Sequence, residues 1–222
     1  MKIRSPSLPL PIRRKRATKP AWAKQRTGRG SPHETRPDVN GPVHVTLRIC
    51  RGLPSLRTPR AYRVLERAFR AGKEKKNFGL CQYSVQRDHL HLIVEANDRC
   101  ALARGMQGLA IRIAKALNKH WHGRRGSVFS ERYFARALVK PMEVWRALRY
   151  VLNNARKHGD WFSKSLPDPF SSGRWFTRWE GRWGQQMALR SPALATPRHF
   201  LTHFGERWPI RIDEVPGTPS FR

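Results

Sequence analysis

Two histidines separated by one apolar residue, His89 and His91, are the side chains of this sequence best placed to do chemistry. They lie in an alternating stretch that is typical of a β-strand. Side chains alternate along a strand, so both imidazoles point to one face and Leu90 and Leu92 point to the other. Two adjacent imidazoles form half of a metal site. The alternative is a half-buried strand with two histidines facing solvent.

A second pair with the same spacing, His120 and His122, serves as a comparison. It lies at the end of a predicted helix, where side chains two positions apart project about 200° apart around the axis. We therefore expect these two residues to share no metal. Strand geometry, rather than spacing, makes the pair at 89 and 91 a candidate site.

Tyr150 and Asn154 are the other candidates, because their i, i+4 spacing places them on one face of a predicted helix. The amide oxygen of Asn154 suits a hard divalent ion, and the phenol oxygen of Tyr150 is a possible nucleophile. Taken alone, a tyrosine on a helix is more often a packing residue.

The elements that must position these residues follow from hydrophobic periodicity, caps and turn residues. They are a strand at 44–49, a helix opened by Pro59, strands at 78–85 and 89–96, a helix at 99–120, a strand at 128–138 and a helix at 141–159. The first six match an α+β, ferredoxin-like split βαβ fold with one antiparallel sheet. The seventh is an additional helix that bears the tyrosine. The histidine strand is then a middle strand, with one face under the helices and the other face open.

Composition indicates a polyanionic partner. The chain of 222 residues has 45 Lys and Arg against 15 Asp and Glu, a net charge of +30, which points to nucleic acid. No apolar run approaches the roughly 20 residues of a membrane-spanning helix, so we expect no membrane partner. Three cysteines without a CxxC spacing argue against a disulfide scaffold or a zinc ribbon.

Three regions are expected. Residues 1–42 read as a disordered basic arm, because proline and basic residues dominate and large apolar residues are few. Residues 43–159 hold the predicted domain, and 160–222 form a basic, tryptophan-rich extension. Trp175, Trp179 and Trp183 recur every four residues and suggest a helical stripe that packs the extension onto the domain, with base stacking as the alternative.

These motifs resemble the HUH single-tyrosine transposases, and among them the bacterial REP-associated tyrosine transposases. The resemblance spans residues 43–159 and rests on four stretches: HVTLR at 44–48, RDHLHLIVEA at 87–96, GSVFSERYF at 126–134 and RYVLNN at 149–154. Family members often have Asn-Pro where this chain has Asn154 followed by Ala155, a mild departure because proline is not a ligand.

The resemblance implies an HUH endonuclease that acts as a metal-dependent transposase in DNA transposition and recombination. Tyr150 would be the nucleophile that forms a 5′-phosphotyrosine, and His89, His91 and Asn154 would hold a divalent ion, Mg²⁺ or Mn²⁺. The substrate would be single-stranded or hairpin DNA. The protein would act as a monomer or homodimer in the bacterial cytoplasm, associated with the nucleoid. Basic side chains would contact the DNA phosphates, and they include Arg48, Arg87, Arg124, Arg125, Arg132 and Arg149.

Two other functions stay open at this point. The chain could be a catalytically inactive or domesticated protein that binds a specific hairpin, or a small basic RNA-binding protein in which the histidine pair is a coincidence. A single-strand cleavage assay separates the enzyme from the binding protein.

Overall fold

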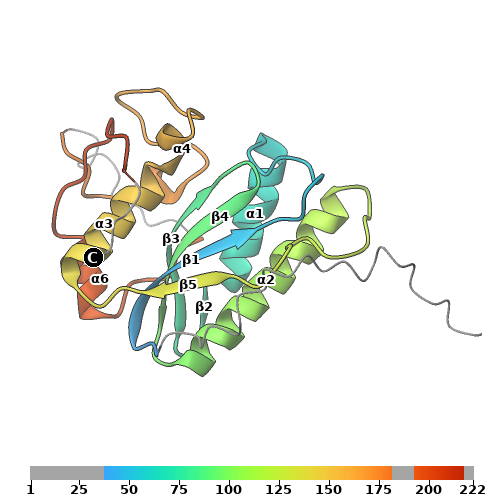
Figure 1. Ribbon diagram of the computed structural model, residues 1–222, viewed down its shortest axis with the longest axis horizontal. Coiled ribbons are helices and arrows are strands. Elements are labelled where there is room, and N and C mark those ends of the chain that lie inside the picture. Colours follow the sequence, from blue (N-terminus) through green and yellow to red (C-terminus); the bar gives the residue numbers. More distant parts are fainter. Residues whose placement is uncertain (1–37, 182–192, 218–222) are drawn as a thin grey trace, which may run out of the picture. The chain divides into compact units, whose positions relative to one another are not determined.

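The centre of the structure, a computed structural model that describes residues 38–181 and 193–217, is a five-stranded sheet. The strands lie in the order β2-β3-β4-β1-β5, and neighbours are antiparallel (Figure 1). They are β1 (Gly41–Arg48), β2 (Glu74–Lys75), β3 (Phe78–Val85), β4 (His89–Ala96) and β5 (Phe134–Ala137). The predicted α+β, ferredoxin-like fold is confirmed, and the histidine strand β4 lies between β1 and β3.

Helices α1 (Pro59–Gly72) and α2 (Arg99–His120) cover one face of the sheet (Figure 1). Both begin where expected, because the side chains of Thr58 and Asp98 accept hydrogen bonds from backbone N–H groups of the first turn. Their apolar stripes pack against the side of β4 that carries Leu92, and together they form the larger hydrophobic core.

The opposite face is covered in part, so the prediction of an open face is only partly right. Helices α3 (Pro141–Leu152) and α6 (Phe200–Gly205) lie on this side (Figure 1) and form a second core with Cys81 and Ile93 of the sheet. The apolar face of α3, which includes the fully buried Leu148, requires such a partner surface. The histidine pair lies in the same strand as Ile93 and therefore beside this packed layer.

Three predicted elements differ from the structure, and β2 was not predicted. The first strand was expected at 44–49, whereas β1 covers Gly41–Arg48. The fourth strand is shorter than the predicted 128–138, since β5 covers only Phe134–Ala137 and a single bridge joins Phe129 to Ile49. The predicted helix at 141–159 is broken: α3 ends at Leu152 and a short helix, α4 (Asn154–Lys157), follows.

The break occurs at Asn153, whose backbone leaves the helical region with φ −103° and ψ 9°. Its side-chain amide donates a hydrogen bond of 2.9 Å to the carbonyl oxygen of Arg211 in the C-terminal segment. Asparagine readily exchanges helical geometry for a side-chain contact, which is why a tertiary hydrogen bond can end a helix here.

The expected tryptophan helix is absent from the described part of the extension. Ser172–Trp175 form one 3₁₀ turn, η2, and Trp179 follows in irregular chain, while Trp183 lies outside the described residues. Trp179 is nevertheless buried, and its indole N–H donates to the Gly173 carbonyl at 2.7 Å. Packing of the extension onto the domain, the favoured interpretation, therefore holds for Trp179.

The described residues belong to one compact unit. The predicted arm at 1–42 lies outside them apart from its last five residues, and the proposed boundary at 159 stays a prediction. The three cysteines are free thiols. Across 38–181 and 193–217, the structure contains no helix with the length and apolar character needed to cross a membrane.

Candidate active site

His89 and His91 lie on the same face of β4, as strand alternation predicts. Both are buried, with 8% and 5% of their surface exposed. Their rings meet edge to face, and the two Nε2 atoms are 3.1 Å apart. The two ring nitrogens best able to act as ligands therefore converge on one point.

The other nitrogen of each ring is held by a neighbour. Nδ1 of His89 is 2.7 Å from a carboxylate oxygen of Asp88. Nδ1 of His91 is 3.2 Å from Nε2 of His44 and 3.2 Å from the hydroxyl of Thr46. These contacts favour a proton on each Nδ1, which leaves a lone pair on each Nε2. Partners of this kind fix the tautomer and orientation of metal-binding histidines in other proteins.

His44 was not predicted as a site residue, although its strand was. It lies on β1 and faces the same side as the pair, because Thr46 is directly opposite His91 in the register of β1 and β4. Nothing local in the sequence marks it, since its proximity to His91 depends on how the two strands pair.

All three imidazoles are held in the neutral form. Burial lowers the pKa of His91 to about 2, and Lys157, together with the neighbouring histidines when they are protonated, acts in the same direction. Burial, together with the charge of Arg136, lowers the pKa of His44 to about 4. Burial also lowers the pKa of His89, against the opposing hydrogen bond to Asp88. Metal binding requires neutral imidazoles, so this environment suits a ligand set.

Tyr150 is brought to the histidines by α3. Its ring centroid is 5.2 Å from that of His91 and 5.9 Å from that of His44, and both contacts are edge to face. The side chain is partly buried. The structure therefore places the predicted nucleophile against His91 of the predicted pair, although the two are far apart in the sequence.

Two further residues, Lys157 and His158, reach the site from the end of α4. The ammonium group of Lys157 is 5.2 Å from the centroid of the Tyr150 ring, and the ring of His158 is 5.7 Å from that of His89. Sequence reasoning missed both, because the break at Asn153 decides where they point. The only available signal was their basic character near the end of a helix.

Asn154, the predicted third ligand, is the first residue of α4 and is completely buried. Neither its Oδ1 nor its Nδ2 makes a hydrogen bond. Buried amides almost always have partners, so an amide without one requires an explanation, and an absent ligand is one. Among the described residues no group of three or more His, Cys, Asp or Glu side chains could hold an ion. An ion at the histidine pair would therefore need donors of another kind, such as an amide oxygen.

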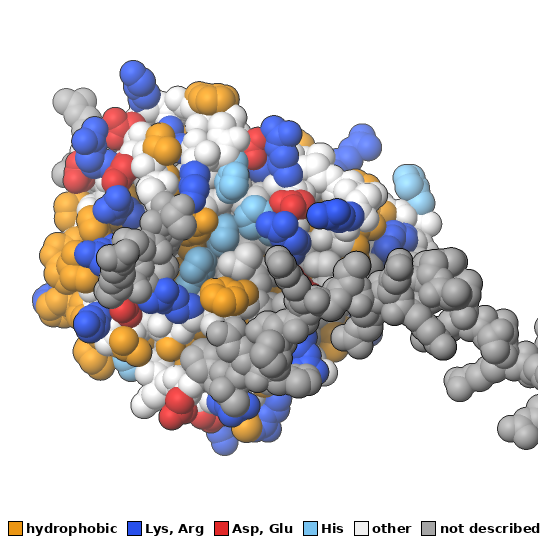
Figure 2. Space-filling view, in the orientation of Figure 1, with side chains coloured by type: hydrophobic (Ala, Val, Ile, Leu, Met, Phe, Trp, Pro, Cys, Tyr) orange, Lys and Arg blue, Asp and Glu red, His pale blue; other side chains and the backbone are white. Residues whose placement is uncertain are grey.

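The predicted DNA-binding arginines differ in their exposure and in the groups that they already contact. Figure 2 shows lysine and arginine side chains around histidines gathered at the middle of one face. Arg125 and Arg132 are exposed, and Arg48 is exposed with its guanidinium 4.0 Å from Asp88. Arg124 donates to Asn118 and to a backbone carbonyl.

Arg87 and Arg149 each pair with a carboxylate of the C-terminal region. Arg87 is paired with Asp160 at 2.6 Å, and Arg149 with Glu214 at 2.5 Å. Arg149 also stacks on Trp145. Their predicted roles in DNA binding stay predictions, but both have a structural partner already.

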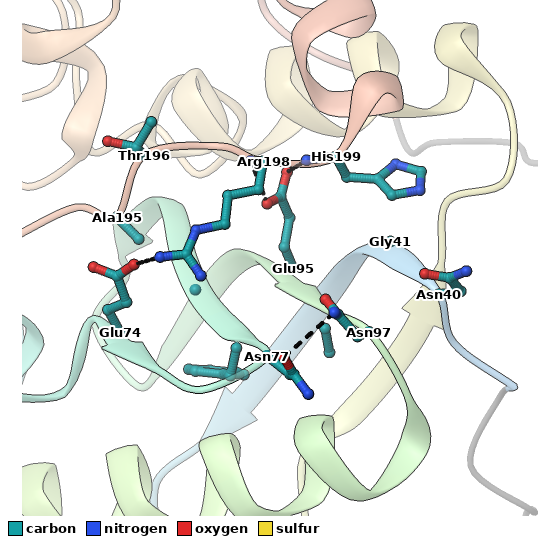
Figure 3. Close-up of a pocket in the computed structure, with 13 residues that line it drawn as sticks. Asn40, Gly41, Glu74, Asn77, Glu95, Asn97, Ala195, Thr196, Arg198 and His199 are labelled. Atoms are coloured by element: carbon teal, nitrogen blue, oxygen red, sulfur yellow. Dashed lines mark hydrogen bonds and ion pairs between the residues drawn. The ribbon is translucent and has the colours of Figure 1, made fainter.

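Glu95 lies on β4, at the far end of the face that carries the histidines. It is buried and accepts hydrogen bonds from the backbone N–H groups of Arg198 and His199 (Figure 3). A cavity of about 280 Å³ lies beside it, lined in part by Asn77 and Asn97. Glu95 therefore anchors the C-terminal segment on the sheet.

Comparisons with known proteins identify the family and the fold. The model of the family described as "Transposase IS200 like" matches residues 42–154, half of the chain. No curated protein matches. A solved structure described as that of a REP-associated tyrosine transposase bound to a REP hairpin is similar, with a TM-score of 0.52 and 18% sequence identity over 64% of this chain and 82% of that chain. At this identity the likeness concerns the fold.

Proposed function

The chain belongs to the IS200-like transposase family, and from this premise we propose that it nicks and rejoins single-stranded DNA through a covalent tyrosine intermediate. The observation that carries the proposal is the position of Tyr150, whose ring lies 5.2 Å from that of His91 beside two converging Nε2 atoms. A nucleophile next to a pair of ligand nitrogens is the arrangement that metal-assisted phosphoryl transfer requires.

In the proposed reaction the phenol oxygen of Tyr150 attacks the scissile phosphorus. A bond forms between this oxygen and phosphorus, and the bond to the 3′ oxygen breaks. The phenol gives up a proton and the leaving 3′ oxygen gains one. The product is a 5′-phosphotyrosine and a free 3′-hydroxyl. One phosphodiester replaces another, so a second 3′-hydroxyl can reverse the step without ATP.

His89, His91 and Asn154 would hold the divalent ion, Mg²⁺ or Mn²⁺. Donors at about 2.1 Å and at right angles around such an ion are roughly 3 Å apart, and the two Nε2 atoms are 3.1 Å apart. The buried amide of Asn154 has an unpaired oxygen to contribute. When bound, the ion would polarise the phosphate and offset the negative charge that develops on it.

Lys157 and His158 would contact the DNA phosphate from the side of α4. Lys157 carries positive charge close to the Tyr150 ring, where negative charge builds on the phenol oxygen and phosphate. Preorganised charge of this kind lowers the barrier more than the same charge in water.

Hairpin DNA is the proposed substrate. The solved relative was bound to a REP hairpin, and the net charge of +30 suits a polyanion. We expect the active site to be complete within one chain, because Tyr150 and His91 of the same chain are in contact. A mixture of Tyr150→Phe and His91→Ala proteins tests this point. Recovered activity in the mixture would show that two chains share a site.

The test of the function is formation of a covalent protein–DNA adduct. A labelled single strand carrying a hairpin is incubated with Mn²⁺ and resolved on a denaturing gel. The parent protein should form an adduct, Tyr150→Phe should form none, and Tyr133→Phe should behave as the parent. An adduct that persists in Tyr150→Phe would reassign the nucleophile. Hairpin binding without an adduct in the parent would support the non-catalytic DNA-binding alternative.

A further inference from the structure

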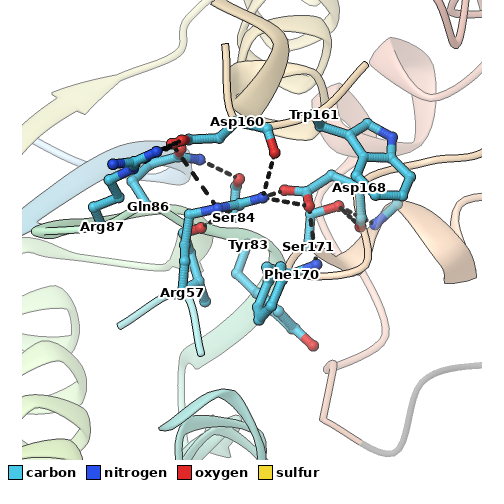
Figure 4. A network of polar contacts seen from close by, with 12 residues as sticks. Arg57, Tyr83, Ser84, Gln86, Arg87, Asp160, Trp161, Asp168, Phe170 and Ser171 are labelled. Atoms are coloured by element: carbon cyan, nitrogen blue, oxygen red, sulfur yellow. Dashed lines mark hydrogen bonds and ion pairs between the residues drawn. The ribbon is translucent and has the colours of Figure 1, made fainter. Parts of the chain in front are cut away.

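The turn that precedes the histidine strand is tied to the segment that follows α4 (Figure 4). Arg87 in this turn donates from Nε to Asp160 at 2.8 Å, and its Nη2 lies 2.6 Å from the same carboxylate oxygen. The Arg87 side chain is 73% exposed, whereas that of Asp160 is only 6% exposed. The carboxylate is therefore buried, and an exposed arginine covers it.

A second guanidinium group, that of Arg57, lies on the other side of Asp160. It is buried and binds Asp168 with two hydrogen bonds of 2.9 and 3.0 Å. It also donates to the carbonyl oxygen of Val85 at 2.8 Å, lies 3.9 Å from the Asp160 carboxylate and stacks on Phe170. Arg57 thus joins the end of β3 to both aspartates.

The network connects the two halves of the proposed site. On one side, Arg87 is directly followed by Asp88, which holds the ring of His89. On the other side, Asp160 comes two residues after His158, whose ring contacts that of His89. Tyr150 lies on α3, the helix that precedes this segment. Besides the second core, in which α3 packs on Cys81 and Ile93, Asp160 is therefore a polar point at which the tyrosine half is attached to the histidine half.

The two aspartates of this network lie beyond the family match. That match ends at residue 154, so Asp160 and Asp168 belong to the part of the chain beyond it. The backbone of this part also pairs with β3, since Val85 donates to the carbonyl of Phe170 at 2.9 Å and Ser84 forms a bridge with Ser171. The extension is thus integrated into the sheet next to the site.

We propose that Asp160 is a positioning residue which, through Arg87 and Arg57, sets the separation between the histidine pair and the tyrosine-bearing segment during strand transfer. The inference rests on the proposed function. This separation matters because a displacement of about 1 Å in an active site, even one caused by a remote change, can slow an enzyme about a hundredfold. If Arg87 instead bound DNA, its guanidinium would contact phosphate and not Asp160, and its loss would weaken hairpin binding.

The test uses three variants of the full chain: Asp160→Asn, Arg87→Ala and the double variant. Asn is nearly the same size, and Arg57 keeps its two bonds to Asp168, so the fold should survive, which the thermal midpoint verifies. Arg211→Ala is the matched control, since Arg211 is an exposed arginine paired with a nearby aspartate, Asp213. Adduct formation is measured in single turnover at saturating hairpin and Mn²⁺, and hairpin affinity is measured separately.

We expect Asp160→Asn to slow adduct formation about tenfold to a hundredfold and to leave hairpin affinity within about twofold. Arg87→Ala should cause a similar loss, and the double variant should lose no more than Asp160→Asn alone, because the pair acts as a unit. Arg211→Ala should react as the parent does.

Three results would overturn the inference. They are an Asp160→Asn rate within twofold of the parent, multiplied losses in the double variant, or a rate loss fully explained by weaker hairpin binding. If the parent reacts and Asp160→Asn reacts equally fast, only the positioning role is refuted. If neither the parent nor Arg211→Ala forms an adduct, the proposed function itself fails and the positioning role with it.

Discussion

Replacing Asn154 with leucine should stabilise the metal-free protein while it abolishes the chemistry. The Asn154 side chain is 0% exposed, and both of its polar atoms lack a hydrogen-bond partner. Burying an amide without partners costs about 1–3 kcal/mol, and leucine of similar shape removes that cost. The free energy of unfolding should therefore rise by about 1–3 kcal/mol. For a chain of this size each kcal/mol raises the melting temperature by roughly 2–4 °C.

The preceding residue provides a matched control. Asn153 is also buried, at 2% exposure, but its amide donates a hydrogen bond to the carbonyl of Arg211. Asn153→Leu removes this donor, and the Arg211 carbonyl oxygen loses its hydrogen bond. The free energy of unfolding should therefore fall by about 1–3 kcal/mol. The same substitution at adjacent positions should thus have opposite signs.

The assay is urea unfolding in EDTA and again in Mn²⁺. The ion should stabilise the parent, because a ligand that binds only the folded state shifts unfolding by mass action, and it should stabilise Asn154→Leu less. Adduct formation should be lost in Asn154→Leu. The reasoning is refuted if Asn154→Leu is less stable than the parent in EDTA, or if Mn²⁺ stabilises both proteins equally.

Three further outcomes are expected. The folded-state pKa of His44 is about 4, against 6.5 for an ordinary histidine, so the unfolded chain binds more protons between these two pH values. The free energy of unfolding should therefore fall by about 3 kcal/mol from pH 6.5 to pH 4. His44→Gln should reduce this fall, as measured by urea unfolding at a series of pH values. Arg125→Ala should lower the slope of log hairpin affinity against log salt by about one, whereas Arg149→Ala, whose guanidinium is already paired, should leave it unchanged. Glu95→Gln should weaken the attachment of residues 193–217, seen as faster proteolysis of that segment with little change in the sheet; equal cleavage of both proteins would contradict this.

The two strands of the histidine hairpin, β3 and β4, could be predicted to the residue. The predicted ranges 78–85 and 89–96 are those of β3 and β4, because alternation of apolar and polar residues is a local property of the chain. The shared face of His89 and His91 follows from the same alternation. The family could be recognised for a related reason, since its motifs are short and each lies within one element.

The partners of the histidine pair were harder to find. His44 becomes a neighbour of His91 only through the register of β1 against β4, and register is a property of two strands together. Lys157 and His158 reach the site only because the chain leaves the helix at Asn153, and that break depends on a hydrogen bond to a residue 58 positions away.

The sequence by itself therefore determined β3 and β4, the starts of the two covering helices, the face on which the histidines lie and the candidate nucleophile. Each of these follows from side-chain spacing, turn residues or a motif within a few positions. Only the tertiary structure decided which groups surround Tyr150, how the second core covers the face, and how Asp160 joins Arg87 across 73 positions. A buried carboxylate pairs with the cationic side chain that lies next to it in the folded protein. The order of residues in the sequence does not show which side chain that is.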